Sequence, residues 1–324
     1  MNNQVNSPII EVTDLQTWFP VKGGVLGRTN HYVKAVDRVS LRVNHGEIVA
    51  LVGESGCGKS TLGNSLAGLL PIRGGQLLFR GNAAFQRNRL QREVFQNKVQ
   101  VIFQDPYSSL NPKHTVFEIL SFPLLHHKIC TRNEVSDYIA SLLEQVGMSP
   151  EYMNRYPHSF SGGQRQRISI ARAIGMKPDL MICDEIVSSL DVSIQAQIVE
   201  LLLELRNKLD LALLFIAHDL SLVRALSDRI YVMYLGKIVE SGNTAEVLSS
   251  PSHPYTRALV QSVPTLNREC PPVILQGEVP SFTNMPVGCS FQNRCPNKSE
   301  RCMNEPEITE SNQRELRCYH PVQI

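Results

Sequence analysis

The chain has 324 residues, 42% of them hydrophobic, which is enough for one large domain or two modest ones around a sizeable core. Its 32 basic residues nearly balance its 30 acidic residues, so the net charge of +2 gives no electrostatic reason to expect a nucleic-acid partner. The first residues lack the basic and apolar segments of a secretory signal, and no apolar run approaches the roughly 18 residues of a membrane-spanning helix. These features predict a cytoplasmic protein that meets a membrane only through partners.

A phosphate-binding turn follows the first predicted strands. Residues 9–52 read as short strands with turns between them, ending in the apolar run EIVALVG, which is typical of a strand buried on both faces. Residues 53–61 fit GxxxxGKS between this strand and a helix that begins near Ser60, the context in which the motif binds nucleotide phosphates. The candidate nucleotide ligands in this turn are Gly53, Ser55, Gly56, Cys57, Gly58, Lys59, Ser60 and Thr61.

The residue types in this turn suit a bound nucleotide. Glycines let backbone N–H groups wrap around phosphates, and the N-terminus of the following helix adds positive potential. Lys59 is placed to reach the β and γ phosphates, and Ser60 is placed to bind Mg²⁺. The strand and helix on either side disfavour the alternative, a glycine-rich turn with a purely structural role.

Strands and helices alternate in the middle of the chain. A strand at 99–105 leads into a mostly helical insert at about 114–156, which includes apolar residues at helical spacing over 135–148. A strand at 179–185, a helix at 194–209 and a strand at 211–219 follow, and a hairpin closes this core near residue 242. The alternation predicts a mostly parallel sheet covered on both faces, with ligands beyond the carboxyl ends of its strands.

Two carboxylates end the predicted strand at 179–185. Asp184 is suited to hold Mg²⁺ through its hydration shell, and Glu185 to polarise the attacking water, because phosphoryl transfer depends on positioning and charge stabilisation. A lone Asp-Glu pair after a strand is more often a solvated strand end. The phosphate-binding turn upstream favours the catalytic interpretation.

The segment Ser161-Gly162-Gly163-Gln164 opens a predicted helix. It resembles the signature of ABC ATPases, which in that family caps the γ-phosphate of ATP held by the opposite protomer. Ser161 and the backbone of Gly163 then supply donors at a helix N-terminus, the physics that also favours phosphate binding in the turn. For Ser161 taken alone, an ordinary helix N-cap is an alternative.

Further positions resemble the same family in the family's order. Gln104 resembles the Q-loop glutamine and a third magnesium ligand, Asp191 ends a segment like the D-loop, and His218 resembles the switch histidine. Phe19 is the candidate for stacking on adenine, with Trp18 and Tyr32 as alternatives. Two positions depart from the family pattern without removing a ligand, since the resemblance leads us to expect Pro at 186 and Ala at 189, where the chain has Ile186 and Ser189.

Three other segments, 104–116, 253–264 and 288–296, resemble the ATPases of oligopeptide, dipeptide and nickel importers, and residues 19–35 resemble the second of their two ATPase subunits. The resemblance implies an α/β phosphate-loop NTPase fold with an antiparallel β subdomain and a helical subdomain. A nucleotide-binding domain would span residues 1–250, with the helical subdomain at about 105–172, and a Cys-rich extension residues 251–324. The implied cofactors are ATP and Mg²⁺, and the implied partners are a second, related ATPase, two transmembrane permease subunits and an extracytoplasmic peptide-binding protein.

Cysteines crowd the C-terminal part of the chain. Clustered thiols in a reducing compartment suit zinc or an iron–sulfur cluster, and the absence of CxxC pairs disfavours a zinc ribbon. The resemblance implies a four-iron, four-sulfur cluster, with unligated thiols and the exchange of one ligand for Cys270 or His320 as alternatives. The candidate ligands are Cys289, Cys295, Cys302 and Cys318.

The motifs together predict an ATP-hydrolysing subunit of a peptide importer at the cytoplasmic face of the membrane, with nickel as the less favoured cargo. An ABC protein of DNA repair or translation fits less well, because the chain has one ATPase core and no sustained heptads. A regulatory subunit that binds ATP without hydrolysis is disfavoured by the presence of Lys59, Glu185 and His218.

Overall fold

A computed structural model describes residues 8–23, 28–84, 89–105, 109–263, 280–311 and 313–322. Cys270 and parts of the segments 19–35, 104–116 and 253–264 lie outside these ranges. The chain folds into two compact units, one formed mainly by Ala84–Leu214 and the other by Ile10–Val43, Glu47–Ala83 and Phe215–Ile324. Within the parts of the chain that the structure describes, none of the helices has both the length and the apolar character needed to cross a membrane.

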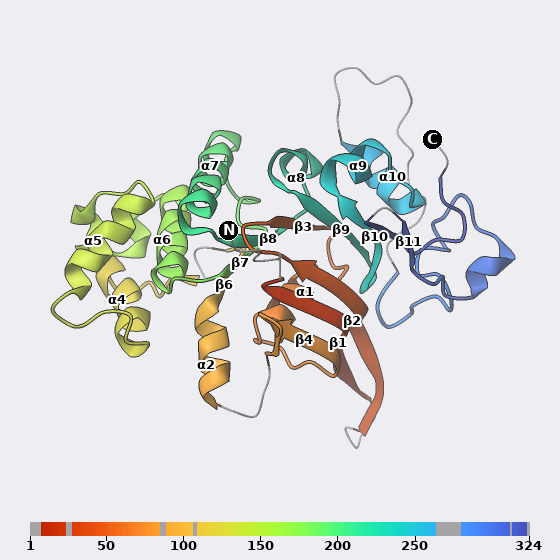
Figure 1. The fold of residues 1–324 in the computed structure, drawn as a ribbon, viewed down its shortest axis with the longest axis horizontal. Helices are drawn as coiled ribbons and strands as arrows, with labels where there is room; N and C mark the ends of the chain where they lie inside the picture. The colour runs from red at the N-terminus through yellow and green to blue at the C-terminus, as the bar shows by residue number, and fades with distance from the viewer. Residues whose placement is uncertain are drawn as a thin grey trace, which may run out of the picture. The chain divides into compact units, whose positions relative to one another are not determined.

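The first unit contains a strand group in the order β8-β7-β6, with β6 and β7 parallel, and a set of helices. Helices α4, α5 and α6 pack against one another, as the yellow and green ribbons of Figure 1 show. Strand β8 carries the chain out of this unit after Leu214. Its elements are α2 (Arg89–Lys98), β6 (Val99–Ile102), α4 (Val116–His126), α5 (Val135–Gln145), η1 (Pro150–Asn154), η2 (Pro157–Ser159), α6 (Gly162–Gly175), β7 (Leu180–Asp184), α7 (Val192–Leu209) and β8 (Ala212–Ala217).

Local sequence explains where these elements begin and what they bury. Every residue of β7 and β8 is buried, which confirms the two apolar strands predicted here. Helix α4 begins at a capping box, in which the Thr115 hydroxyl accepts from the Glu118 N–H and the Glu118 carboxylate accepts from the Thr115 N–H. Helix α5 buries Val135, Ile139 and Leu142 at helical spacing against its neighbours.

The second unit contains an antiparallel sheet in the order β2-β1-β4-β5 and a strand group in the order β11-β12-β10-β9-β3, in which only the β3–β9 pair is parallel. All five residues of β3 are buried, as the run EIVALVG predicts. Its elements are β1 (Ile10–Gly23), β2 (Arg28–Val43), β3 (Ile48–Val52), α1 (Lys59–Leu66), β4 (Gly74–Phe79), β5 (Asn82–Ala83), α8 (Leu220–Leu226), β9 (Arg229–Tyr234), β10 (Lys237–Asn243), α9 (Thr244–Ser249), α10 (Pro254–Ser262), η3 (Glu300–Met303), β11 (Thr309–Ser311) and β12 (Arg314–Leu316).

The prediction of several short strands over residues 9–52 is wrong for the segment before β3. Two long strands, β1 and β2, pair along most of their length, with register shifts that absorb extra residues. Asp14 and Arg38 have φ of 50° and 53°, left-handed values, and both lie at register shifts of the β1–β2 pair. These positions are bulges, which bend a strand without ending it.

The C-terminal residues extend the strand group of the second unit through β12, which pairs with β10. A buried carboxylate supports this junction: Glu240 is fully buried and accepts from the backbone N–H groups of Ser252 and His253 and from the Arg314 guanidinium. Because a buried charge needs both a partner and hydrogen bonds, this network ties the extension to β10.

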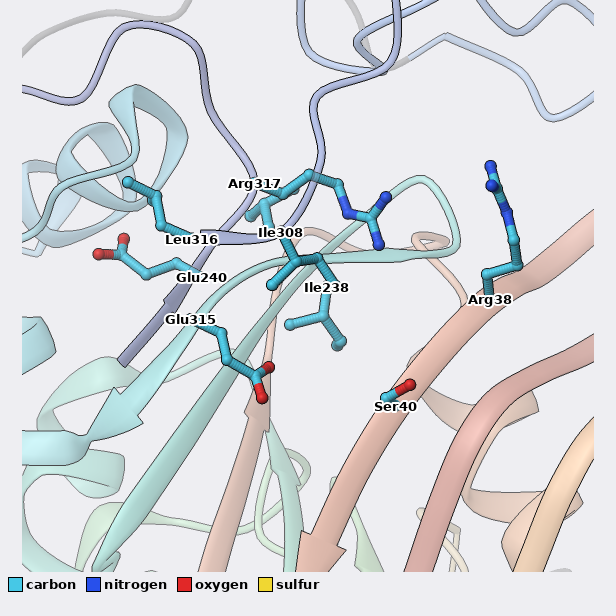
Figure 2. A pocket seen from close by; sticks show the side chains of 9 residues that line it. Arg38, Ser40, Ile238, Glu240, Ile308, Glu315, Leu316 and Arg317 are labelled. Atoms are coloured by element: carbon cyan, nitrogen blue, oxygen red, sulfur yellow. The ribbon is translucent and has the colours of Figure 1, made fainter. Parts of the chain in front are cut away.

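A second charged cluster holds the extension against β2. The Glu305 carboxylate accepts hydrogen bonds from Lys237, Arg38 and Arg317, the last at 2.9 Å. A cavity of about 10 Å³, room for about one water molecule, lies beside this contact, lined in part by Ser40, Ile238 and Leu316. In Figure 2 the Arg317 side chain points toward β2, whereas Glu240 points away from it. This cavity is too small for a ligand larger than a water molecule.

Candidate active site

The phosphate-binding turn, residues 53–61, joins β3 to α1 in the second unit. Gly53 and Gly58 have φ of 154° and 109°, and an added Cβ would lie 2.2 Å from the backbone oxygen of Met233 at Gly53 and 2.2 Å from that of Ala35 at Gly58. Only glycine fits such close backbone contacts. Gly56 also has a left-handed φ of 76°, but its missing Cβ would face open space. The turn is therefore packed on one side and open on the other.

The side chains of the turn likewise include both buried and exposed ones. Lys59 is 4% exposed, and its ammonium donates to the carbonyl oxygens of Gly53 (2.8 Å) and Glu54 (3.1 Å), which arches it across the turn. Ser55 and Ser60 are exposed, and Thr61 is half-buried. Cys57 is fully buried, and burial raises the pKa of its thiol, so only its backbone is available to a ligand.

The predicted carboxylates lie at the end of β7 in the first unit. Asp184 is buried, and Glu185 adopts a φ of 49°, an uncommon conformation for a non-glycine residue. The Gln104 amide, which follows β6, donates to the Glu185 carboxylate at 2.9 Å. The Ser188 hydroxyl donates to the Glu185 carbonyl oxygen at 2.9 Å and so stabilises the chain just after β7. The parallel strands β6 and β7 thus bring Gln104 and Glu185 together, 81 residues apart in the sequence.

The predicted signature segment forms the N-terminus of α6, also in the first unit. The exposed Ser161 is the N-cap: its hydroxyl accepts from the Gln164 N–H at 3.3 Å, and the Gln164 side chain accepts from the Ser161 N–H at 3.1 Å. The alternative role of Ser161 as a helix N-cap is therefore confirmed, and its side chain is also exposed. An added Cβ on Gly163 would lie 2.5 Å from the Ile194 side chain of α7, and one on Gly162 would lie 3.2 Å from Leu190. The glycines allow α6 and α7 to approach closely.

Two further predicted residues lie at exposed element ends. Asp191 is the N-cap residue of α7 in the first unit, without a side-chain capping hydrogen bond. His218 follows β8 in the second unit and is exposed, while the adjacent Asp219 caps α8 by accepting from the Ser221 N–H at 2.8 Å. Neither side chain is packed into a core, so both are accessible for contacts with a ligand or partner.

Comparison with known proteins decides the family. The family described as "ABC transporter" matches residues 36–188, and "Oligopeptide/dipeptide transporter, C-terminal region" matches residues 239–302. The chain is 45% identical to the oligopeptide transport ATP-binding protein AppF of Bacillus subtilis, covering 94% of each chain. It is 40% identical to the dipeptide transport ATP-binding protein DppF of Haemophilus influenzae, covering 99% of each.

The chain therefore belongs to the ATP-binding proteins of ABC transporters. This ABC ATPase also shares its fold with CbiO1 of Clostridium perfringens, part of an ABC transporter complex, with a TM-score of 0.64, 26% identity, and coverage of 75% of this chain and 91% of that one. The predicted ABC ATPase fold and enzyme class are confirmed: the chain is an ATPase of a family for which ATP and Mg²⁺ are expected.

The candidate aromatic side chains of the ABC ATPase differ in their surroundings. The Trp18 ring has Lys34 at 4.6 Å and Arg73 at 5.2 Å from its centroid, and Arg73 also lies 4.0 Å from the centroid of Tyr32. Cations thus cover both alternative rings. Phe19 follows Trp18 in the same strand and is 36% exposed.

The four C-terminal cysteines of the ABC ATPase lie near one another but do not form a metal site of recognisable geometry. Burial raises the pKa values of the Cys289, Cys295 and Cys318 thiols, that of Cys318 to about 11, and neighbouring thiols, Cys302 included, raise them further. Among the residues that the structure describes, no group of three or more His, Cys, Asp or Glu side chains could hold a metal ion. The predicted iron–sulfur or zinc site thus has no support here. The Nε2 atom of the alternative ligand His320 is 2.6 Å from the Ser299 hydroxyl.

Sequence patterns did not identify three residues that act on the phosphate-binding turn. The Glu54 carboxylate accepts from both terminal nitrogens of Arg294, at 2.6 and 3.0 Å, and the Glu54 N–H donates to the Tyr255 hydroxyl at 2.8 Å. Glu54 occupies one of the unspecified positions of GxxxxGKS, and Arg294 is 240 residues away. Tyr255 and Arg294 lie in the segments 253–264 and 288–296 that resemble peptide importers, but the resemblance assigned neither residue a role at the turn.

Proposed function

We propose that this ABC ATPase hydrolyses ATP through Glu185, with Gln104 beside it. The observation that carries this assignment is the 2.9 Å hydrogen bond from the Gln104 amide to a Glu185 carboxylate held in a left-handed backbone next to buried Asp184. Backbone strain of this kind concentrates at functional sites. Glu185 polarises the attacking water, and His218 assists it.

The phosphate-binding turn and the carboxylates hold MgATP in this proposal. Lys59 binds the β and γ phosphates, and the turn donates backbone N–H groups from its open side, where Ser55 and Gly56 are exposed. Mg²⁺ chemistry suits oxygen ligands, and the candidate ligands are Ser60, Gln104 and Asp184. The ion offsets phosphate charge as it develops in the transition state.

Phe19 is the side chain assigned to stacking on adenine. The support is its position relative to Leu15 in the family pattern, together with the cations Lys34 and Arg73 that the rings of Trp18 and Tyr32 already face; exposure does not separate Phe19 (36%) from Tyr32 (37%). Successive residues of a strand point to opposite faces, so Phe19 and Trp18 serve different surfaces.

Hydrolysis in this proposal requires a second, related ATPase. Ser161, Gly162, Gly163 and Gln164 lie at the N-terminus of a 14-residue helix, with Ser161 exposed, where N–H groups and the helix dipole favour an anion. They cap the γ-phosphate bound by the partner, and Asp191 lines the same junction. A heterodimer follows from the resemblance of residues 19–35 to the second ATPase of such importers.

The transported cargo is proposed to be di- and oligopeptides. The support is the names of the relatives, which are oligopeptide and dipeptide transport ATP-binding proteins that match nearly the whole chain, including its C-terminal region. None of the relatives reported above is named for nickel, the less favoured cargo. The ATPase would act at the cytoplasmic face of the membrane on two permease subunits, with an extracytoplasmic protein supplying the peptide.

The proposal divides the chain into a nucleotide-binding domain, residues 1–250, with a helical subdomain at about 105–172, and an extension, residues 251–324. In the extension, Cys289, Cys295, Cys302 and Cys318 are proposed as ligands of a four-iron, four-sulfur cluster. The support is the clustering of these cysteines in the sequence and the resemblance of residues 288–296 to the peptide-importer ATPases. Iron and sulfide assays of the anaerobically purified chain test this, and an iron-free chain in which all eight cysteines titrate as thiols would refute it.

The catalytic assignment is tested with Glu185→Gln, which keeps the size of the side chain. Binding of ATP should be unchanged and hydrolysis by the assembled transporter should fall by roughly two orders of magnitude or more, in the range lost with general bases. Glu200→Gln, on the exposed part of α7, is a matched control and should leave turnover unchanged. Unchanged turnover in Glu185→Gln would assign the catalytic base elsewhere.

A further inference from the structure

The structure assigns to Arg294 and Tyr255, both outside the nucleotide-binding domain, the role of positioning residues for the phosphate-binding turn. Arg294 binds the side chain of Glu54 through two parallel hydrogen bonds, and Tyr255 binds its backbone. This role rests on the proposed binding of ATP by the turn. The extension is then part of the ATP site and sets its affinity.

The contacts hold one residue of the turn, Glu54, from three directions. The Glu54 N–H donates to the Tyr255 hydroxyl at 2.8 Å, its carbonyl accepts from Lys59 at 3.1 Å, and its carboxylate accepts from Arg294. A bidentate guanidinium–carboxylate pair fixes orientation as well as distance. A loop that binds phosphates through backbone N–H groups depends on the direction in which those N–H groups point. Fixing Glu54 therefore preorganises the loop.

The two holding residues are themselves rigidly placed. Rings of Tyr234, Tyr255 and Phe291 lie with centroids 4.7 to 5.4 Å apart, in a cluster that joins β9 to two parts of the extension, α10 and the segment around Phe291. Tyr255 is fully buried, and the side chain of Arg294 is only 7% exposed. Such aromatic packing limits the rotamers available to both residues, so the turn is held against a fixed surface.

Charge gives a second reason for the pair. Glu54 places a carboxylate within a loop that binds a polyanion, and repulsion between like charges disfavours binding. The Arg294 guanidinium offsets that charge through its ion pair with the Glu54 carboxylate. Removing the guanidinium alone leaves an uncompensated carboxylate in the ATP site.

The test compares Arg294→Met with Arg317→Met in the full chain. The control removes an ion pair of similar burial in the same extension, since Arg317 is 11% and Glu305 28% exposed, against 7% and 26% for Arg294 and Glu54. We expect the Kd for MgATP, measured by titration calorimetry, to rise roughly fivefold to thirtyfold in Arg294→Met and less than about twofold in the control. In the assembled transporter, KM should rise while kcat at saturating ATP changes less than about twofold, because binding of ground state and transition state falls together.

A double variant separates positioning and charge from a general loss of stability. Adding Glu54→Gln to Arg294→Met removes the unpaired carboxylate, so ATP should bind no more weakly than to Arg294→Met alone. Tyr255→Phe keeps the ring and removes the hydroxyl, and should also raise the Kd for ATP; it carries the test if Arg294→Met fails to fold. Equal affinities of wild type, Arg294→Met and Tyr255→Phe would overturn the inference. A wild-type chain that binds no ATP would instead refute the proposed function.

Discussion

Two glycines of the phosphate-binding turn have left-handed backbones but opposite surroundings, and alanine at each position separates backbone strain from steric clash. Gly56 has a φ of 76° with no atom within 4 Å of an added Cβ, whereas at Gly58, with φ of 109°, the Cβ would lie 2.2 Å from the Ala35 carbonyl oxygen. Gly56→Ala should cost about 1–2 kcal/mol of stability from the left-handed conformation. Gly58→Ala should cost a further ~1–3 kcal/mol, because a backbone oxygen cannot rotate out of the way.

Urea unfolding of the nucleotide-free chain measures this difference. Trp18 is the only tryptophan and lies on β1, in the same unit as the turn, so its fluorescence reports the unfolding of that unit. With a denaturant slope of about 1–3 kcal/mol per molar, a 2 kcal/mol difference separates the two midpoints by about 0.7–2 M. Equal midpoints, or a lower midpoint for Gly56→Ala, would refute the steric argument.

Three further variants test other parts of the site. Gln104→Ala removes the 2.9 Å hydrogen bond to Glu185 and should lower kcat by roughly tenfold, measured by phosphate release; an unchanged kcat would contradict the role of that bond. Ser161→Ala removes the cap of α6 and should lower the free energy of unfolding by about 0.5–2 kcal/mol, whereas Ser161→Asn should preserve most of it. Burial lowers the pKa of His253 from 6.5 to about 3, so the unfolded chain binds a proton that the folded chain excludes, and stability should fall by about 1.4 kcal/mol per pH unit below pH 6.5. His253→Asn keeps an acceptor for the Tyr255 N–H and should reduce the slope of unfolding free energy against pH by about 1.4 kcal/mol per pH unit, the contribution of one proton. An unchanged slope would exclude His253 as its source.

The turn and its flanking elements could be predicted because their signals are local. The run EIVALVG, the glycines and the Lys-Ser pair specify strand, turn and helix within 15 residues, and the structure places β3 and α1 accordingly. The buried strands β7 and β8 were predictable for the same reason. The prediction of several short strands in place of β1 and β2 was wrong because bulges, as at Asp14 and Arg38, bend a strand without ending it, and only strand pairing distinguishes a bulge from a turn.

The contacts between distant segments were beyond sequence reasoning. The bond from Arg294 to Glu54 joins residues 240 positions apart, and neither residue belongs to a periodic pattern. Strands β11 and β12 have three residues each, too few for alternation to appear, and they form because β12 pairs with β10. The clustering of the cysteines predicted a common site, but spacing alone does not fix the geometry that ligation needs.

Uptake of labelled peptide by proteoliposomes tests the central claim most directly. The complex is purified through a tag on this chain, reconstituted with its binding protein, and supplied with ATP on the side of the ATPase. The account predicts that peptide enters only with ATP, that two membrane subunits and a second ATPase are present, and that Glu185→Gln abolishes uptake while ATP still binds. Hydrolysis of ATP by the intact complex without any peptide uptake would contradict the proposed transport function.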